Sequence, residues 1–146
     1  MLRKLEIQNY AIIDRLEIAF PEGLSIITGE TGAGKSILLG ALGLIMGKRA
    51  DSKVLYDQER KCYVEATFDI KAYLLQDFFT EEGLEYYDEL IIRRDIAPGG
   101  KSRAFVNDSP VTLDILQTLT EGLIDIHQQF DMLDIQKPAF QLQMID

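Results

Sequence analysis

The sequence contains no tryptophan, one cysteine and one histidine in 146 residues. A single cysteine, Cys62, excludes an intrachain disulfide and fits a reducing compartment. No run of 18 apolar residues occurs, so the sequence predicts no membrane-spanning helix. The first residues alternate between polar and apolar side chains without the apolar core of a signal peptide. We therefore expect a cytoplasmic protein that does not engage a membrane.

Basic residues are also scarce, since 15 lysines and arginines face 24 aspartates and glutamates and give a net charge of −9. A body of this charge repels nucleic-acid phosphates, which argues against a broad nucleic-acid-binding surface but leaves room for a local basic patch. The hydrophobic fraction of 47% is ordinary for a globular protein. The chain is long enough to bury the core of one domain.

The most specific motif is residues 29–36, Gly-Glu-Thr-Gly-Ala-Gly-Lys-Ser, which fits the P-loop pattern G-x-x-x-x-G-K-[ST]. Residues 24–28 before it predict a short buried strand, and residues 37–42 after it predict a helix. Glycines let the loop backbone approach phosphates, Lys35 adds charge near the β- and γ-phosphates, and the Ser36 hydroxyl is placed to ligate Mg²⁺. The predicted nucleotide-binding residues are Gly29, Glu30, Thr31, Gly32, Ala33, Gly34, Lys35, Ser36 and Ile37.

Alternation of apolar and polar residues predicts the strands. We expect an antiparallel pair over residues 4–9 and 15–20, a clean strand over 63–70, a hairpin of 89–96 with 102–107, and a short strand over 123–127. Because this β-rich arrangement is not a simple βαβ alternation, the sequence predicts an α/β fold of the P-loop NTPase type, with a mixed β-sheet around the P-loop helix.

Helical spacing predicts three helices, over residues 35–46, 74–79 and 113–121, and a polar surface loop over 48–61. The first helix is apolar nearly all round and should be buried, with Gly47 as its C-terminal cap. Gly40 and Gly43 lie on one side of it, where we expect a neighbouring backbone to come close.

A P-loop identifies a ligand and not a reaction. Hydrolysis also needs a Walker B carboxylate at the end of an apolar strand and a group that orients water. Asp125 and Asp95 are the nearest candidates, but neither follows an apolar run of four, so both are interpreted as surface carboxylates. Cys62 lies in a predicted strand and is interpreted as a buried structural thiol.

Four basic residues gather around the predicted hairpin: Arg93, Arg94, Lys101 and Arg103. Such a cluster can contact DNA, or it can be a solvated sheet edge that discourages strand–strand association. We favour the solvated edge.

Several stretches of the chain resemble the RecN family of bacterial DNA repair proteins. They are residues 5–13, 27–36, 41–44 with 47–51, 101–107 and 124–129. Together they span the whole chain, and the Gly-Lys-Arg-Ala-Asp stretch at 47–51 is more specific than a generic P-loop.

The resemblance implies an SMC-like, ABC-type ATPase head that is split in sequence by a long antiparallel coiled coil. Residues 1–146 would then be the N-terminal ATP-binding lobe. Walker B, the signature motif and the switch histidine would belong to a C-terminal half-head. The implied cofactors are ATP and Mg²⁺. The implied partners are that C-terminal half-head, a second head in a homodimer, and DNA, with nucleoid association when DNA is bound.

The resemblance also implies a role for Gln129, as the Q-loop glutamine that reaches Mg²⁺ and the attacking water. The family usually has His-Gly-Gln-His here, whereas this chain has His127-Gln128-Gln129-Phe130. Gln128 is therefore the alternative, and His127 is interpreted as a structural residue. Lys35 and Gln129 are the expected catalytic residues, and Ser36 and Gln129 the expected metal ligands.

Two other functions remain open at this stage. One is a self-contained P-loop kinase or GTPase, which the missing Walker B and the missing Asn-Lys-x-Asp guanine motif disfavour. The other is a non-catalytic DNA-binding or scaffold module with a vestigial P-loop, which the intact Lys35 and Ser36 disfavour. The motif does not select the base, so ATP follows from the resemblance alone.

Overall fold

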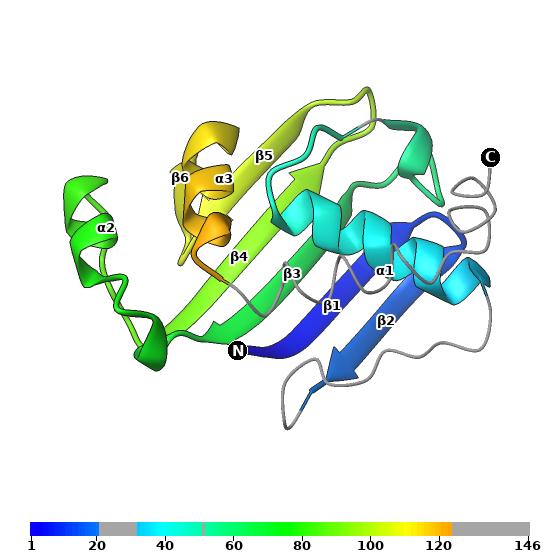
Figure 1. The fold of residues 1–146 in the computed structure, drawn as a ribbon. Helices are drawn as coiled ribbons and strands as arrows, with labels where there is room; N and C mark the ends of the chain where they lie inside the picture. The colour runs from blue at the N-terminus through cyan, green and yellow to red at the C-terminus, as the bar shows by residue number, and fades with distance from the viewer. Residues whose placement is uncertain (21–31, 51, 124–146) are drawn as a thin grey trace, which may run out of the picture.

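The structure is a computed structural model, and it describes residues 1–20, 32–50 and 52–123 (Figure 1). Its centre is a six-stranded sheet in the order β2-β1-β3-β4-β5-β6, in which every neighbouring pair is antiparallel. The strands are β1 (Leu2–Tyr10), β2 (Ile13–Ala19), β3 (Cys62–Asp69), β4 (Glu89–Ile96), β5 (Ser102–Val106) and β6 (Ser109–Val111). The expected strand over 24–28, and all but Leu123 of the one over 123–127, lie outside the described residues.

Within the described part of the chain, three α-helices accompany the sheet: α1 (Gly32–Ile45), α2 (Gln76–Glu81) and α3 (Leu113–Glu121). Two short 3-10 helices, η1 (Ser52–Val54) and η2 (Lys71–Tyr73), lie in connections. In Figure 1, α1 crosses one face of the sheet and α3 lies over β5 and β6, while α2 projects away from the body. None of the described helices covers the opposite face of the sheet.

Strand alternation explains why the sheet has one apolar face. On β3, Cys62, Val64, Ala66 and Phe68 are all buried, and the residues between them are only partly so. The register places Val64 opposite Ile7 of β1, so the buried positions line up across strands. Apolar burial of this kind is the main favourable term in folding. The expected α/β arrangement, a sheet around the P-loop helix, is confirmed, and the strand pairs described are all antiparallel.

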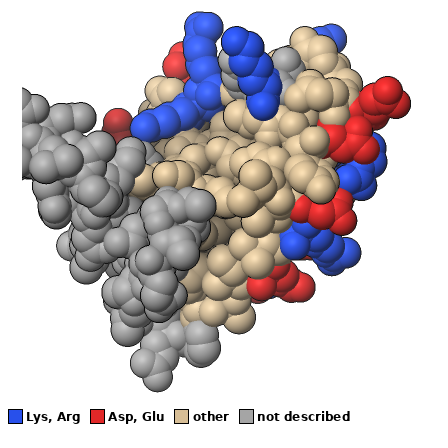
Figure 2. Space-filling model, turned by 90° about the vertical axis from the view of Figure 1, so that its right-hand side faces the viewer, with Lys and Arg blue, Asp and Glu red and all other residues tan. Residues whose placement is uncertain are grey.

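The other face of the sheet carries pairs of oppositely charged side chains. Lys4 and Glu17 lie 2.8 Å apart, and Arg15 and Glu6 lie 3.2 Å apart. Viewed from the right-hand side of Figure 1, acidic and basic side chains alternate along one edge of the molecule (Figure 2). Exposed pairs of this kind contribute little stability, but they keep this face polar.

Helix α1 is buried along most of its length, as predicted from its apolar sequence. The side of α1 that carries Gly40 and Gly43 differs from the expectation in one respect. Among the described residues, the atoms nearest to a Cβ added at Gly40 belong to the Tyr10 side chain, and those nearest at Gly43 belong to the Lys48 side chain. Side chains, and not a neighbouring backbone, therefore make the close approach. Gly47 ends the helix with φ +96°, a conformation that glycine adopts readily.

The second helix begins two residues later than its apolar spacing predicted. Leu74 has φ 55° and is 79% exposed, so α2 begins only at Gln76 and retains Phe79 as its buried anchor. The left-handed conformation of Leu74 separates η2 from α2, which the spacing of leucines does not reveal. The polar loop over 48–61 is also more structured than expected, because Leu55 is buried and pairs with Tyr10.

Candidate nucleotide-binding site

The P-loop motif leads directly into α1. Gly29, Glu30 and Thr31 lie outside the described residues, whereas Gly32, Ala33, Gly34 and Lys35 form the first turn of the helix. Ser36 follows on an exposed position and Ile37 is buried. The first turn contains no acidic residue, so no carboxylate of its own offsets the partial positive charge of the helix N-terminus. The motif thus occupies the position from which a helix binds an anion.

The opposite end of α1 is fixed by side chains from other elements. Its closing carbonyl groups accept hydrogen bonds from a strand and from a second helix. Arg94 of β4 donates to Leu44 O at 2.8 Å and to Lys48 O at 2.7 Å, and Gln117 of α3 donates to Gly47 O at 2.9 Å. These bonds join the last turn of α1 and the residues just after it to β4 and α3.

Arg94 corrects the sequence interpretation of a solvated basic edge. The residue is 0% exposed, and β4 is an interior strand between β3 and β5. Its second nitrogen donates to Ser102 Oγ at 2.6 Å, and among the described residues no carboxylate forms an ion pair with it. Burial lowers the pKa of the guanidinium. Alternation with Ile92 and Ile96 was the signal that placed Arg94 on the core face.

Arg93 points to the other face and is also unlike a free surface cation. Its Nε lies 2.7 Å from Asp95 Oδ1, and its guanidinium lies 4.5 Å from the centre of the Tyr63 ring. The hydrogen bond to Asp95 is the main reason that the pKa of Arg93 is raised. Lys101 and Arg103 are exposed, so only these two of the four cations match the expected solvated cluster.

Asp95 and Cys62 match their structural interpretations. Asp95 pairs with Arg93 and lies 3.5 Å from Lys61, so its charge is compensated within the sheet face. The Cys62 thiol is fully buried, and that burial raises its pKa to about 12. Neither residue has the environment of a reactive group. Asp125, His127, Gln128 and Gln129 lie outside the described residues, so the Q-loop and Walker B interpretations stay predictions.

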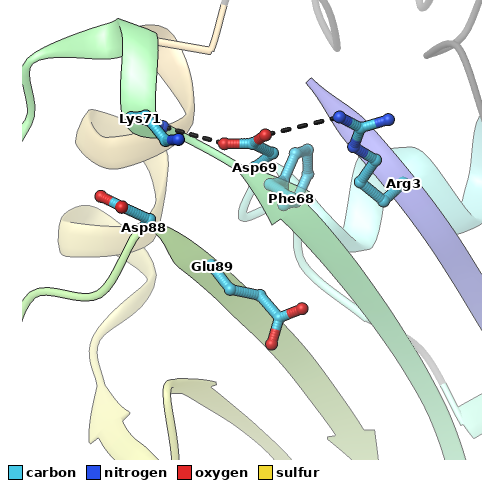
Figure 3. A pocket seen from close by; sticks show the side chains of 6 residues that line it. All are labelled: Arg3, Phe68, Asp69, Lys71, Asp88 and Glu89. Atoms are coloured by element: carbon cyan, nitrogen blue, oxygen red, sulfur yellow. Dashed lines mark hydrogen bonds and ion pairs between the residues drawn. The ribbon is translucent and has the colours of Figure 1, made fainter.

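A cavity of about 310 Å³ lies at the sheet end where β1 begins and β3 ends (Figure 3). Asp69 is one of the residues that line it, and its carboxylate accepts a hydrogen bond from Lys71 N at 3.1 Å and another from the Arg3 guanidinium at 3.4 Å. The bond from Lys71 N is the main reason that the pKa of Asp69 is lowered. The residues that line the cavity come from β1, β3, η2, β4 and the residue before β4, and none of these lining residues belongs to α1. It is therefore not part of the P-loop site.

Within residues 1–20, 32–50 and 52–123, no cluster of three or more His, Cys, Asp or Glu could hold a metal ion. In the same part of the chain, no helix is long and apolar enough to span a membrane.

The sequence matches a known family over nearly its whole length. A family model described as AAA domain matches residues 4–143. The DNA repair protein RecN of Vibrio cholerae is 43% identical over 147 residues, and that of Bacillus subtilis is 38% identical over 148 residues. Each alignment covers 100% of this chain and 26% of the relative, so the chain spans about a quarter of these proteins.

Solved structures share the fold at lower identity. The SMC head domain from Thermotoga maritima has a TM-score of 0.55 and 21% identity, and covers 81% of this chain and 41% of its own. A structure from work on ATP-driven dimerization of SMC ATPases has a TM-score of 0.63 and 20% identity, with 84% and 79% covered. The recombination mediator protein RecF has a TM-score of 0.58 and 21% identity, with 80% and 29% covered. The predicted SMC-head-like P-loop fold is thus confirmed.

Proposed function

The chain belongs to the AAA domain family, and we propose that it is the ATP-binding N-terminal lobe of an ATPase acting in DNA double-strand-break repair and recombination. The observation that carries the proposal is the P-loop sequence at 29–36 running into the anchored, buried helix α1. The biological process comes from the RecN relatives, which are 32–43% identical to this chain. The full activity belongs to a longer protein, of which this lobe corresponds to about a quarter.

In the proposed site, the backbone N–H groups of residues 29–34 and the N-terminus of α1 hold the nucleotide phosphates. Lys35 places its charge at the β- and γ-phosphates, and Ser36, which is exposed at the second turn, supplies a hydroxyl ligand to Mg²⁺. Bound Mg²⁺ would neutralise charge on the phosphates during transfer. Ile37 is buried in the hydrophobic core. ATP is proposed as the nucleotide because of the relatives.

Hydrolysis in this proposal needs residues from two further bodies. Gln129, or Gln128 in its place, would orient the attacking water from this lobe. A C-terminal half-head joined through a coiled coil would supply the Walker B carboxylate, and a second head would supply the signature motif. The assembled protein, in the cytoplasm and on the nucleoid, would engage DNA. The lobe alone should therefore bind nucleotide and hydrolyse it only near the background rate.

A self-contained kinase or GTPase receives no support from the relatives named above. A non-catalytic scaffold with a vestigial P-loop is the more serious alternative, and it is distinguished by the intact Lys35 and Ser36. A scaffold would not need a first helical turn without acidic residues, which α1 has.

A steady-state phosphate-release assay tests whether this lobe needs a C-terminal half-head to hydrolyse the nucleotide that it binds. We expect background turnover from the 146-residue chain and Lys35-dependent turnover when a matching C-terminal half-head is added. Gln129→Ala should then lower that turnover, whereas Gln128→Ala should lower it less. Robust turnover by the 146-residue chain alone would instead establish a self-contained enzyme.

A further inference from the structure

Arg94 is the largest fully buried side chain of the described residues, and it is a charged one. Burying a guanidinium costs several kcal/mol of hydration free energy unless its protons find good acceptors. Here the acceptors are two backbone carbonyls, of Leu44 and Lys48, and the hydroxyl of Ser102. Its Nε has no partner among the described residues. An apolar side chain would fill this position at lower cost, so core packing alone does not account for an arginine.

The position of these acceptors is specific. Leu44 lies in the last turn of α1, and Lys48 follows the glycine that ends the helix. A cation at this end is favourable because the helix dipole is negative there. Ser102 begins β5, the partner strand of β4 in the hairpin. One planar guanidinium therefore joins the last turn of α1, the residues just after it and the start of β5. Arginine can do this because its donors lie in a rigid fork.

A helix behaves as a rod, so fixing one end constrains the other. Gly32 and Leu44 are separated by about 18 Å along α1, at the usual rise of 1.5 Å per residue. A tilt of the rod at Leu44 therefore displaces the first turn, which carries the P-loop glycines and Lys35. Interiors are closely packed and transmit such strain instead of absorbing it.

We propose that Arg94 is a positioning residue for nucleotide binding, which clamps the C-terminal end of the P-loop helix to the β4–β5 hairpin. This inference rests on the proposed nucleotide site and adds to it a residue far from the phosphates. Arg94 touches no ligand, and it acts through the placement of α1. The clamp consists of Arg94, Ser102 and the carbonyls of Leu44 and Lys48.

Calorimetric titration with Mg-ATP tests the clamp when it is paired with a stability control. Arg94→Met should weaken binding about fivefold or more at a temperature where the variant is fully folded. Phe79→Leu is the control, since Phe79 is buried in α2 against Tyr86, away from α1, and should lower the melting temperature without changing affinity. Equal affinities of Arg94→Met and the unmodified chain would overturn the proposal.

Two milder variants keep the test valid if Arg94→Met does not fold. Arg94→Lys keeps the charge but not the fork, and should recover only part of the affinity. Ser102→Ala removes one of the three contacts and should weaken binding less than Arg94→Met. Full recovery by lysine would contradict positioning by the fork.

Hydrogen exchange without nucleotide separates this inference from the proposed function. In Arg94→Met, amides 42–46 should exchange about tenfold faster, while those of β3 keep their protection. If the unmodified chain binds no Mg-ATP, the proposed function fails, and the clamp is then decided by exchange alone. Unchanged protection of α1 in Arg94→Met would overturn it.

Discussion

Asn9 and Asp57, 48 residues apart, bond to each other twice: Asn9 Oδ1 accepts from Asp57 N at 2.6 Å, and Asn9 Nδ2 donates to Asp57 O at 3.0 Å. The amide of Asn9 thereby imitates a backbone group in a β-bridge. Its Nδ2 also donates to Arg60 O at 2.9 Å. Asn9 is 0% exposed and has φ 59°, a left-handed conformation that asparagine tolerates better than most residues. This single side chain holds the loop after η1 against the end of β1.

Replacing Asn9 should therefore be strongly destabilising. Asn9→Ala leaves several buried backbone groups unpaired and should lower the free energy of unfolding by about 3 kcal/mol. Asn9→Gly should be less harmful than Asn9→Ala by about 1 kcal/mol, because glycine tolerates the positive φ. Urea unfolding of the three proteins measures both differences. Equal stability of Asn9→Ala and the unmodified chain would refute the role of this amide.

The two glycines of α1 should respond differently to alanine. A Cβ at Gly40 would collide with the Tyr10 hydroxyl, whereas a Cβ at Gly43 would meet only the flexible Lys48 side chain, at 3.1 Å. Alanine gains about 1 kcal/mol over glycine inside a helix. Gly43→Ala should therefore be neutral or stabilising, and Gly40→Ala destabilising by about 1–3 kcal/mol.

The double variant Tyr10→Phe with Gly40→Ala provides the control for that collision. Removal of the hydroxyl should restore most of the stability lost in Gly40→Ala, as measured by thermal unfolding. A double variant no more stable than Gly40→Ala would place the cause elsewhere in the helix.

Cys62 should be inert in the folded chain. Burial raises the pKa of its thiol to about 12, from an ordinary value of 9.0, so the reactive thiolate is not formed near neutral pH. Because the folded protein holds this proton more tightly, its contribution to stability is present below pH 9 and is lost as pH rises toward 12. We expect thiol reagents at pH 8 to label Cys62 only after unfolding in urea. Rapid labelling of the folded chain would contradict its burial.

Duplex DNA should bind this lobe weakly and lose that binding as salt is raised. Of the four cations of the hairpin, Arg94 is buried and Arg93 is paired, which leaves Lys101 and Arg103 exposed. Residues 71–89 add six carboxylates against one lysine, which concentrates the negative charge of the chain near α2. In fluorescence anisotropy, Lys101→Ala with Arg103→Ala should abolish the residual binding, and Arg93→Gln should leave it unchanged. Tight binding at physiological salt would contradict this picture.

The strands were predictable because apolar and polar residues alternate along them with a period of two, so that each strand has one apolar face. The hairpin of β4 and β5 and helix α3 agree closely with their predicted ranges. The exposure of Arg94 was predicted wrongly because the residue was grouped with the other basic residues of the hairpin. Its alternation with Ile92 and Ile96 places it on the buried face of β4. Leu74 was misassigned because apolar spacing carries no information about a left-handed backbone.

The candidate site was predictable only in its local part. A P-loop is a contiguous motif whose residues bind through their own backbone, so eight neighbouring letters suffice to recognise it. The anchoring of α1 depends instead on Arg94 and Gln117, which lie 50 and 70 residues from the carbonyls they hold. Long-range contacts of this kind leave no local pattern in a single sequence.

The central claim is that residues 29–36 bind a nucleotide, and isothermal titration with Mg-ATP tests it most directly. Lys35→Ala removes a charge-assisted contact and should weaken binding about ten- to a hundredfold. Lys71→Ala is the matched control, since it removes the same charge beside the cavity at Asp69, whose lining residues do not belong to α1, and it should leave the affinity unchanged. Measurable binding that is lost in Lys35→Ala and kept in Lys71→Ala is the predicted result. Equal affinity of all three proteins for Mg-ATP, or no binding by any of them, would contradict the claim.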